Sequence, residues 1–335
     1  MESILLFSPE NHILGILMII SASRRTDIPA FYTKWLLNRI KAGYCAVPNP
    51  FNRNQVSYVS LKPEDVDVIV FWTRNPAPLM PYLKELDDRG FRYYFQFTIL
   101  DNPNEIDQKT PPLSSTVKTF IKLSDMVGPE RVIWRYDPIV LSKVTGVQFH
   151  IDRYEKIAKE LHGYTIRSVI SVVDVYKKAS RRIADLRKQG IEIIDYQGKS
   201  SERFDFLMEH LVQSATSHKF DIFSCSEVLD LTKYGIKRGK CVDDDYIRQV
   251  FKISVSRKKD PSQRAECGCV ISKDIGMYDS CLFGCQYCYA TSSFERAKIN
   301  HEQHDPNSPS LIGWYKAEQS LEINQGNLFD LGDKS

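Results

Sequence analysis

The chain has 335 residues, a formal net charge of +3, 42% apolar residues and 26% charged residues. This composition is typical of a soluble globular protein with enough apolar surface for a sizeable core. The longest apolar run, residues 13–20, is far shorter than the roughly 20 residues that cross a bilayer, which excludes a membrane span. The mild positive charge permits a nucleic-acid partner without indicating one.

Residues 1–17 form an uninformative N-terminal extension. Glu2 and Glu10 stand where a secretory leader would carry positive charge, so we predict a cytoplasmic protein with no membrane contact. Disulfides are disfavoured in the cytosol. The eight cysteines therefore call for a metal or redox explanation.

From residue 18 onward, short runs rich in Ile, Val and Phe alternate with stretches of helical periodicity. The predicted strands are residues 19–23, 66–73, 93–99, 131–136, 168–173 and 220–224. The predicted helices are residues 29–42, 115–127, 151–161 and 201–217. Strands that alternate with helices pair in parallel, so we predict an α/β fold, a partial or complete (β/α) barrel.

Polar residues follow most of the predicted strands. They are Arg24, Arg25, Thr26, Asp27, Thr73, Arg74, Asn75, Gln96, Arg135, Tyr136, Asp137, Ser171, Asp174, Cys225, Ser226 and Glu227. Each group taken alone is explained by a solvated turn. At the carboxyl ends of parallel strands, together, they would line one cavity.

The alternation of strands and helices stops after residue 228, and five segments follow from the pattern. They are the extension 1–17, the barrel body 18–228, a basic insertion 229–268 that contains cysteines, a last strand and cysteine loop 269–299, and a strap with a flexible tail 300–335. The insertion carries Lys237, Arg238 and Lys240.

The strongest chemical signal is the C-x3-C-x2-C spacing of Cys281, Cys285 and Cys288, the motif cysteines, in a loop that contains Gly284. Three thiolates at this spacing can bind three irons of one 4Fe-4S cubane and leave the fourth iron open. A zinc knuckle, or a cluster completed by a fourth cysteine, is the alternative. Zinc commonly uses C-x2-C pairs, so the x3 spacing counts against it.

Cys225, Cys241, Cys267 and Cys269 form a second set. They can bind a second 4Fe-4S cluster or a zinc ion that ties the insertion to the barrel. Buried free thiols are the alternative, because free cysteine is among the most buried residue types. The spacing leaves all three interpretations open.

The motif cysteines resemble those of radical S-adenosylmethionine (SAM) enzymes, which have an aromatic residue before the third cysteine, as Tyr287 is here. The resemblance implies an enzyme whose open iron binds SAM and whose electron donor is a reductase or flavodoxin. Arg24, Arg25 and Asp27 stand where those enzymes have a Gly-Gly-Glu type motif. We assign them, with Thr73 and Tyr287, to cofactor binding.

The stretches 19–32, 71–76, 134–139, 234–241 and 304–309 resemble an uncharacterised bacterial family known as a domain of unknown function. A more distant similarity, to spore photoproduct lyase, rests on the cysteine motif, Arg135-x-Asp137-Pro138 and Thr73-Arg74-Asn75. It implies DNA lesion repair or base modification, with Arg135, Tyr136 and Asp137 as catalytic candidates. Since those enzymes place the cysteine loop after their first strand, we expect a circularly permuted barrel in which residues 269–273 lie beside residues 19–23.

DNA is the expected substrate, with Lys237, Arg238 and Lys240 contacting phosphates and Trp72, Trp134 or Tyr136 stacking an extruded base. For Trp134, core packing is the favoured role. The tail sequence Gln325-Gly-Asn-Leu328-Phe329 resembles the peptide with which bacterial repair proteins bind the sliding clamp. Packing of this tail on its own barrel is the alternative. An RNA-modifying enzyme of the same chemistry and a non-catalytic iron-sulfur DNA-binding or sensor protein are the alternatives to DNA repair.

Overall fold

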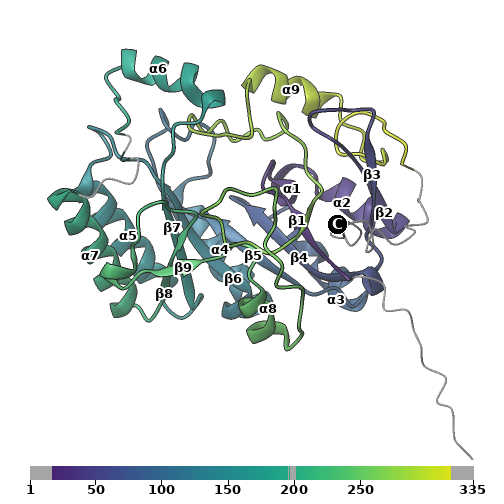
Figure 1. Ribbon diagram of the computed structural model, residues 1–335, viewed down its shortest axis with the longest axis horizontal. Coiled ribbons are helices and arrows are strands. Elements are labelled where there is room, and N and C mark those ends of the chain that lie inside the picture. Colours follow the sequence, from purple (N-terminus) through teal and green to yellow (C-terminus); the bar gives the residue numbers. More distant parts are fainter. Residues whose placement is uncertain (1–16, 195, 197–200, 318–335) are drawn as a thin grey trace, which may run out of the picture.

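The computed structural model describes residues 17–194, 196 and 201–317. Its centre is one sheet of eight parallel strands in the order β10-β1-β4-β5-β6-β7-β8-β9 (Figure 1). The strands are β1 (Met18–Ala22), β4 (Val66–Thr73), β5 (Tyr93–Thr98), β6 (Val132–Ile139), β7 (Arg167–Val172), β8 (Asp221–Cys225), β9 (Lys237–Gly239) and β10 (Lys273–Asp274). This parallel α/β sheet is compatible with a partial barrel. Its class was predicted correctly.

Nine α-helices are present among the described residues. They are α1 (Ile28–Phe31), α2 (Thr33–Ala42), α3 (Leu83–Asp88), α4 (Leu113–Val127), α5 (Val147–Leu161), α6 (Ser180–Lys188), α7 (Glu202–Ser217), α8 (Asp244–Phe251) and α9 (Phe294–Glu302). In Figure 1, α6 and α9 lie at the upper edge and α8 at the lower edge. None of these helices is both long enough and apolar enough to cross a membrane.

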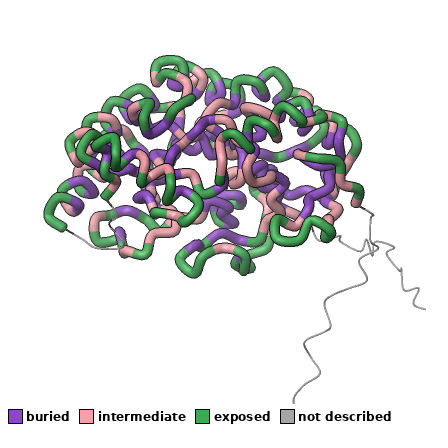
Figure 2. Tube along the Cα trace, turned by 90° about the horizontal axis from the view of Figure 1, so that it is seen from above, coloured by how far each residue is buried: buried purple, intermediate pink, exposed green. Residues whose placement is uncertain are grey.

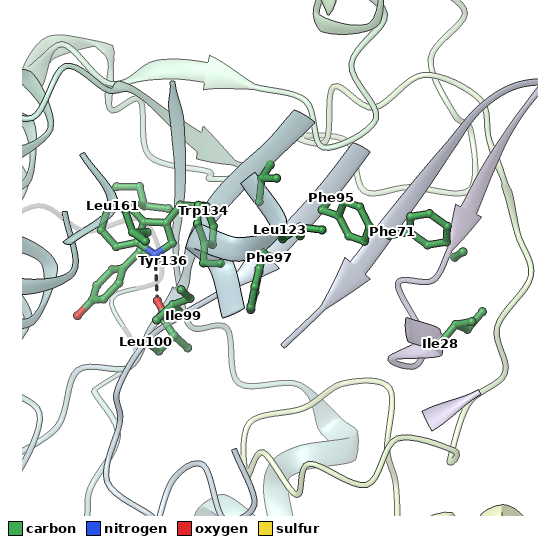
Figure 3. Packing of buried hydrophobic residues seen from close by; sticks show 14 of the residues in the cluster. Ile28, Phe71, Phe95, Phe97, Ile99, Leu100, Leu123, Trp134, Tyr136 and Leu161 are labelled. Atoms are coloured by element: carbon green, nitrogen blue, oxygen red, sulfur yellow. Dashed lines mark hydrogen bonds between the residues drawn. The ribbon is translucent and has the colours of Figure 1, made fainter. Parts of the chain in front are cut away.

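The main core lies between one face of the sheet and helices α1 to α5 and α7. Because side chains alternate along a strand, every second residue enters this core. Phe71, Phe95, Phe97 and Trp134 are 0% exposed there, and Figure 3 shows them packed side by side with Leu123 of α4. Burial of each such ring contributes about 2–3 kcal/mol. Figure 2 shows the buried segments inside a shell of exposed turns.

The opposite face of the sheet has its own core. Val68, Val70, Tyr94 and Ile133 pack there against α8 and the cysteine-bearing segments around it, including Ile247. Tyr94 Oη and Gln96 Nε2 both donate to the Cys241 carbonyl, at 2.8 and 2.9 Å. Residues 229–268 were predicted as an insertion. In the structure they add β9 to the sheet and cover this opposite face, which we call its inner face.

Several predicted elements differ from those observed. The predicted helix 29–42 is interrupted at Tyr32, where α1 ends and α2 begins. A two-stranded antiparallel hairpin, β2 (Tyr44–Pro48) and β3 (Val56–Ser60), was not predicted. Helix α9 continues through Asn300, so part of the predicted strap is helical.

The last strand pairs with the first. Ile20 lies opposite Lys273 and Ser21 opposite Asp274, in parallel register. The expected adjacency of these two segments is present, although β10 is only two residues long and begins four residues later than predicted. This pairing places the loop with the motif cysteines next to the end of β1.

Candidate metal centre

A cavity of about 460 Å³ opens where the strands of the sheet end. Volumes of this order are typical of small-molecule sites. Its wall contains seven of the eight cysteines, together with most of the polar residues that follow the strands. These are Cys225, Cys241, Cys267, Cys269, Cys281, Cys285, Cys288, Arg24, Arg25, Thr26, Asp27, Thr73, Arg74, Arg135, Asp137, Ser171, Asp174 and Ser226.

The cysteine loop is held against the loop that follows β5. Gln286 N donates to the Ile106 carbonyl and Lys109 N to the Phe283 carbonyl, both at 3.0 Å. Gly284 has φ +71°, a left-handed conformation that favours glycine, and a Cβ there would lie 3.1 Å from the Gln108 side chain. The loop therefore keeps the half-buried motif cysteines on the cavity wall.

A buried charge network supports this loop from behind. Asp107 is 1% exposed and accepts hydrogen bonds from Tyr287 Oη at 2.9 Å and from Asn102 Nδ2 at 2.9 Å. Arg74 pairs with Asp107 at 3.3 Å and also donates to Tyr287 Oη. The hydroxyl of Tyr287, predicted to bind cofactor, is thus used for positioning, while the residue still lines the cavity.

Arg182 of α6 holds the far side of the loop. Its guanidinium donates to the carbonyls of Gln286 at 3.0 Å, Ser292 at 3.2 Å and Cys288 at 2.6 Å. Neither Arg182 nor Asp107 was predicted as a site residue, because each follows its strand by several positions. Arg74 was recognised only as a polar residue at a strand end.

Asp274 joins β10 to β1 at the edge of the cavity. Its carboxylate accepts from Ser21 Oγ at 2.9 Å, Ser23 Oγ at 2.7 Å and Arg24 N at 2.8 Å. Gly276 follows it closely, and a Cβ at that position would lie 2.0 Å from Ser23 Oγ. Only glycine lets the cysteine segment approach β1 this closely. Asp274 directly follows the predicted strand 269–273, and this position was the sequence signal for it.

The predicted cofactor residues after β1 differ in whether their polar atoms are already bonded to the protein. Both oxygens of Asp27 accept from the backbone, Oδ1 from Ala30 N at 2.9 Å and Oδ2 from Arg74 N at 2.6 Å, and burial raises its pKa to about 7. Arg24 lies over the Trp72 ring at 5.4 Å, and its Nη2 is buried without a hydrogen-bond partner. Arg25 reaches the Gly276 carbonyl at 3.5 Å and the Tyr278 ring.

Of the three predicted catalytic residues, two line the cavity and one lies in the core. Arg135 and Asp137 line the cavity, and Arg135 donates to Asp137. Tyr136 lies between them on β6, so its side chain points to the other face of the sheet. There it is 0% exposed and bonded to His150 Nδ1 at 2.8 Å, among the core residues of Figure 3. The structure therefore gives no support to Tyr136 as a catalytic or base-stacking residue, and Trp134 is likewise in the core.

Cys225, Cys241, Cys267 and Cys269, the inner cysteines, come together in space. Cys225 ends β8, Cys241 follows β9, and the other two precede β10. The sulfurs of Cys225 and Cys241 are 2.8 Å apart. A hydrogen bond from Cys241 lowers the pKa of Cys225 to about 6. The expectation that these four thiols gather near the cavity is met.

Burial favours the protonated form of two of the motif cysteines. Burial raises the pKa of Cys281 to about 12, and it raises that of Cys285 as well, whereas the Arg74 charge acts to lower the latter. Metal binding replaces the thiol proton, so a metal would relieve this cost. Asp27 and Asp107, the acids whose charges act on Cys281 and Cys285, are already bonded to protein donors.

Cysteine spacing also bears on the choice of metal. Tetrahedral zinc holds thiolates at about 2.3 Å, which places their sulfurs roughly 3.8 Å apart. Within the described residues, the only three metal-binding side chains whose ligand atoms all lie within 4.8 Å are Asp243, Asp244 and Asp245. Asp243 pairs with Arg167, and both Asp244 and Asp245 pair with Lys240. Neither cysteine set is as compact as a zinc site.

The predicted phosphate contacts lie in β9 and just after it, and all of them have acidic partners. Lys237 pairs with Asp221 at 2.7 Å, Arg238 with Asp230 at 3.5 Å and Lys240 with Asp244 at 2.7 Å. The pairs of Lys237 and Arg238 are exposed, and such pairs contribute at most about 1 kcal/mol. The clamp-like residues Gln325, Leu328 and Phe329 lie outside the described residues.

The fold and the site define an α/β protein with a parallel sheet and, where its strands end, a cavity lined by cysteines, arginines and acids. Residues 19–290 match the family described as a domain of unknown function (DUF1848). The chain belongs to this family, as its sequence predicted. No curated protein matches the chain.

Proposed function

We propose that the protein is an iron-sulfur enzyme of the radical SAM type, in which the motif cysteines bind a 4Fe-4S cluster. The observation that carries this proposal is a set of three cysteines, from one loop, on the wall of a small-molecule cavity. The carboxylates of Asp27 and Asp107 are occupied by protein donors. A cluster bound by three thiolates would keep one iron for a cofactor.

The cavity offers unsatisfied polar atoms to such a cofactor. Arg24 Nη2, Thr26 Oγ1 and Ser226 Oγ are buried without hydrogen-bond partners, and all three residues line the cavity. Buried polar groups are normally hydrogen-bonded, so these atoms favour a polar ligand. The Arg24 guanidinium would pair with the carboxylate of SAM.

The topology supports the same resemblance. The cysteine loop follows β10, and β10 pairs with β1, so the last strand in the chain takes the position beside the first. A barrel of radical SAM type with its first strand moved to the end of the chain would have this arrangement. Arg74, Asp107, Tyr287 and Arg182 would then hold the cluster-binding loop in place.

When bound and reduced by one electron from a reductase or flavodoxin, the cluster would supply the electron that breaks the S–C5′ bond of SAM, releasing methionine and a 5′-deoxyadenosyl radical. The protein itself would exclude water and orient the cofactor. Arg135 and Asp137, on the same wall, would face the substrate.

We further propose that the substrate is a nucleic acid, with DNA favoured by the similarity to spore photoproduct lyase. Trp72 lines the cavity and offers a ring to an extruded base. Phosphates would compete with the exposed acidic partners of Lys237 and Arg238. Parallel binding assays with DNA and RNA of one sequence, across salt concentrations, distinguish DNA from RNA.

The central experiment incubates anaerobically reconstituted protein with dithionite and SAM. Release of 5′-deoxyadenosine by the wild type, and none by a variant in which Cys281, Cys285 and Cys288 are all Ala, is the expected result. Cys45→Ala is the control, because Cys45 is buried in β2 away from the cavity. A wild type that carries iron but releases no deoxyadenosine would instead indicate a sensor or binding protein.

A further inference from the structure

The inner cysteines form a cluster of side chains that the proposed activity does not use. Cys241 is 4% exposed, Cys267 8% and Cys269 1%, while Cys225 is half-buried. They come from three places in the chain, the end of β8, the turn after β9 and the C-x-C stretch before β10. Folding therefore brings together four thiols that the sequence separates by up to 44 positions, from 225 to 269.

Two of these sulfurs, those of Cys269 and Cys241, accept hydrogen bonds from backbone amides or a guanidinium. Cys241 N and Val242 N both point at Cys269 Sγ, at 3.3 and 3.4 Å. Arg135 Nη1 donates to Cys241 Sγ at 3.1 Å. Hydrogen bonds from backbone amides and a guanidinium stabilise negative charge on sulfur, as they do around metal-bound thiolates.

Two buried arginines, Arg135 and Arg24, lie beside the inner cysteines. Arg135 is 4% exposed, and the charges of Cys225 and Cys241 both act on it. The charges of Cys269 and Cys241 act in the same way on Arg24, whose Nη2 has no hydrogen-bond partner. Asp137 pairs with Arg135 and the Asp274 charge acts on Arg24, so each guanidinium already has one acidic neighbour. A thiolate-bound centre would place further negative charge beside both cations.

A disulfide and a zinc ion both fit the four cysteines less well than an iron-sulfur cluster does. The 2.8 Å between Cys225 Sγ and Cys241 Sγ exceeds the roughly 2.05 Å of a disulfide. No three of the four sulfurs belong to a group compact within 4.8 Å, as tetrahedral zinc requires. The sulfurs form a row of close neighbours, Cys225 to Cys241, Cys241 to Cys269 and Cys269 to Cys267, whose ends are too far apart for one zinc ion. An iron-sulfur cluster binds its thiolates to separate irons, so it would span this row after Cys225 and Cys241 move apart.

We propose that Cys225, Cys241, Cys267 and Cys269 bind a second iron-sulfur cluster, separate from the one at the motif cysteines. Its four ligands complete the coordination, so this cluster has no open iron. All four residues line the same cavity as the motif cysteines, which places the second cluster beside whatever the cavity binds. It also joins residues 229–269 to the inner face of the sheet.

The test uses the variant in which Cys281, Cys285 and Cys288 are all Ala, purified anaerobically and reconstituted with ferrous iron and sulfide. The expected result is that this variant retains iron, sulfide and an iron-sulfur electron paramagnetic resonance signal after reduction. Iron content in the wild type is then higher than in the variant. Replacing Cys241 and Cys269 by Ser in the same background removes the remaining iron.

A matched control replaces Cys45 by Ala in that background and leaves the iron unchanged. If the Cys241 and Cys269 variant does not fold, as judged by circular dichroism, alkylation of the wild type gives a second test. Native, anaerobic protein is treated with iodoacetamide, and protection of Cys225 and Cys269 that is lost on iron chelation supports the proposal. Rapid alkylation of both before chelation would overturn it.

Zinc in place of iron, or no metal at all in the triple Ala variant, would also overturn the proposal. Neither result bears on the radical SAM proposal, which depends on deoxyadenosine release by the wild type. Conversely, the absence of deoxyadenosine release by the wild type would not contradict iron binding by the triple Ala variant. The two proposals can therefore fail separately.

Discussion

The two cysteine sets line one cavity but are built in different ways. The motif cysteines lie within eight residues of sequence in a half-buried loop, and charged side chains hold that loop from behind. The inner cysteines come from three segments, and three of the four are buried, with donors to the sulfurs of Cys241 and Cys269. If both proposals hold, the first centre would be the more accessible one and the second the more enclosed.

The largest effect that tests this comparison is the loss of one motif cysteine. We expect Cys285→Ser to abolish deoxyadenosine formation and to remove iron from the first centre only, because three thiolates leave no spare ligand. Iron and sulfide analysis with the deoxyadenosine assay measures both. Retention of full activity would contradict the assignment of Cys285 as a ligand.

A smaller effect is expected from the charged support of the loop. Arg74→Gln removes the partner of Asp107 and Tyr287 and should reduce iron retention at the motif cysteines about 10- to 100-fold, leaving the inner set loaded. Chelator titration monitored by absorbance gives the retention. Arg89→Gln, which removes an exposed pair with Glu85, is the control and should have no effect.

The contact between Gly276 and Ser23, where the cysteine segment approaches β1, should be sensitive to side-chain volume. Gly276→Ala places a methyl group 2.0 Å from Ser23 Oγ, so we expect a loss of about 1–3 kcal/mol in unfolding free energy. Urea unfolding of the reconstituted protein measures it. Gly146→Ala, with nothing nearer than Ser142 O at 3.8 Å, should cost less than about 1 kcal/mol. Equal effects of the two substitutions would contradict the close approach.

The smallest effect is expected at α6. Arg182→Gln loses three hydrogen bonds to loop carbonyls from a half-exposed position, which should lower stability by about 1 kcal/mol and speed iron loss from the motif cysteines. Thermal unfolding and chelation rates measure these changes. Arg181→Gln, on the exposed side of the helix, provides the comparison. Faster iron loss from the inner set alone would argue against a role for Arg182 at the loop.

Alternation of side chains along a strand explains most of what could be predicted and why the three catalytic candidates separate in the structure. Strand β4 was predicted at its observed bounds, and α5 and α7 within four residues, because their apolar periodicity is strong. The same alternation places Arg135 and Asp137 in the cavity and Tyr136 in the core, so grouping all three as catalytic ignored the side-chain period. The hairpin β2–β3 has weaker alternation and was missed.

The sequence by itself determined the parallel α/β class and the three motif cysteines, since both are local patterns of spacing. It also indicated that β10 would lie beside β1. Only the tertiary structure decided that Asp107, Arg74 and Arg182 support the loop, and that four distant cysteines meet beside Arg135. Such contacts join residues tens to hundreds of positions apart, and their partners are chosen by how the strands order in the sheet, which no local pattern records.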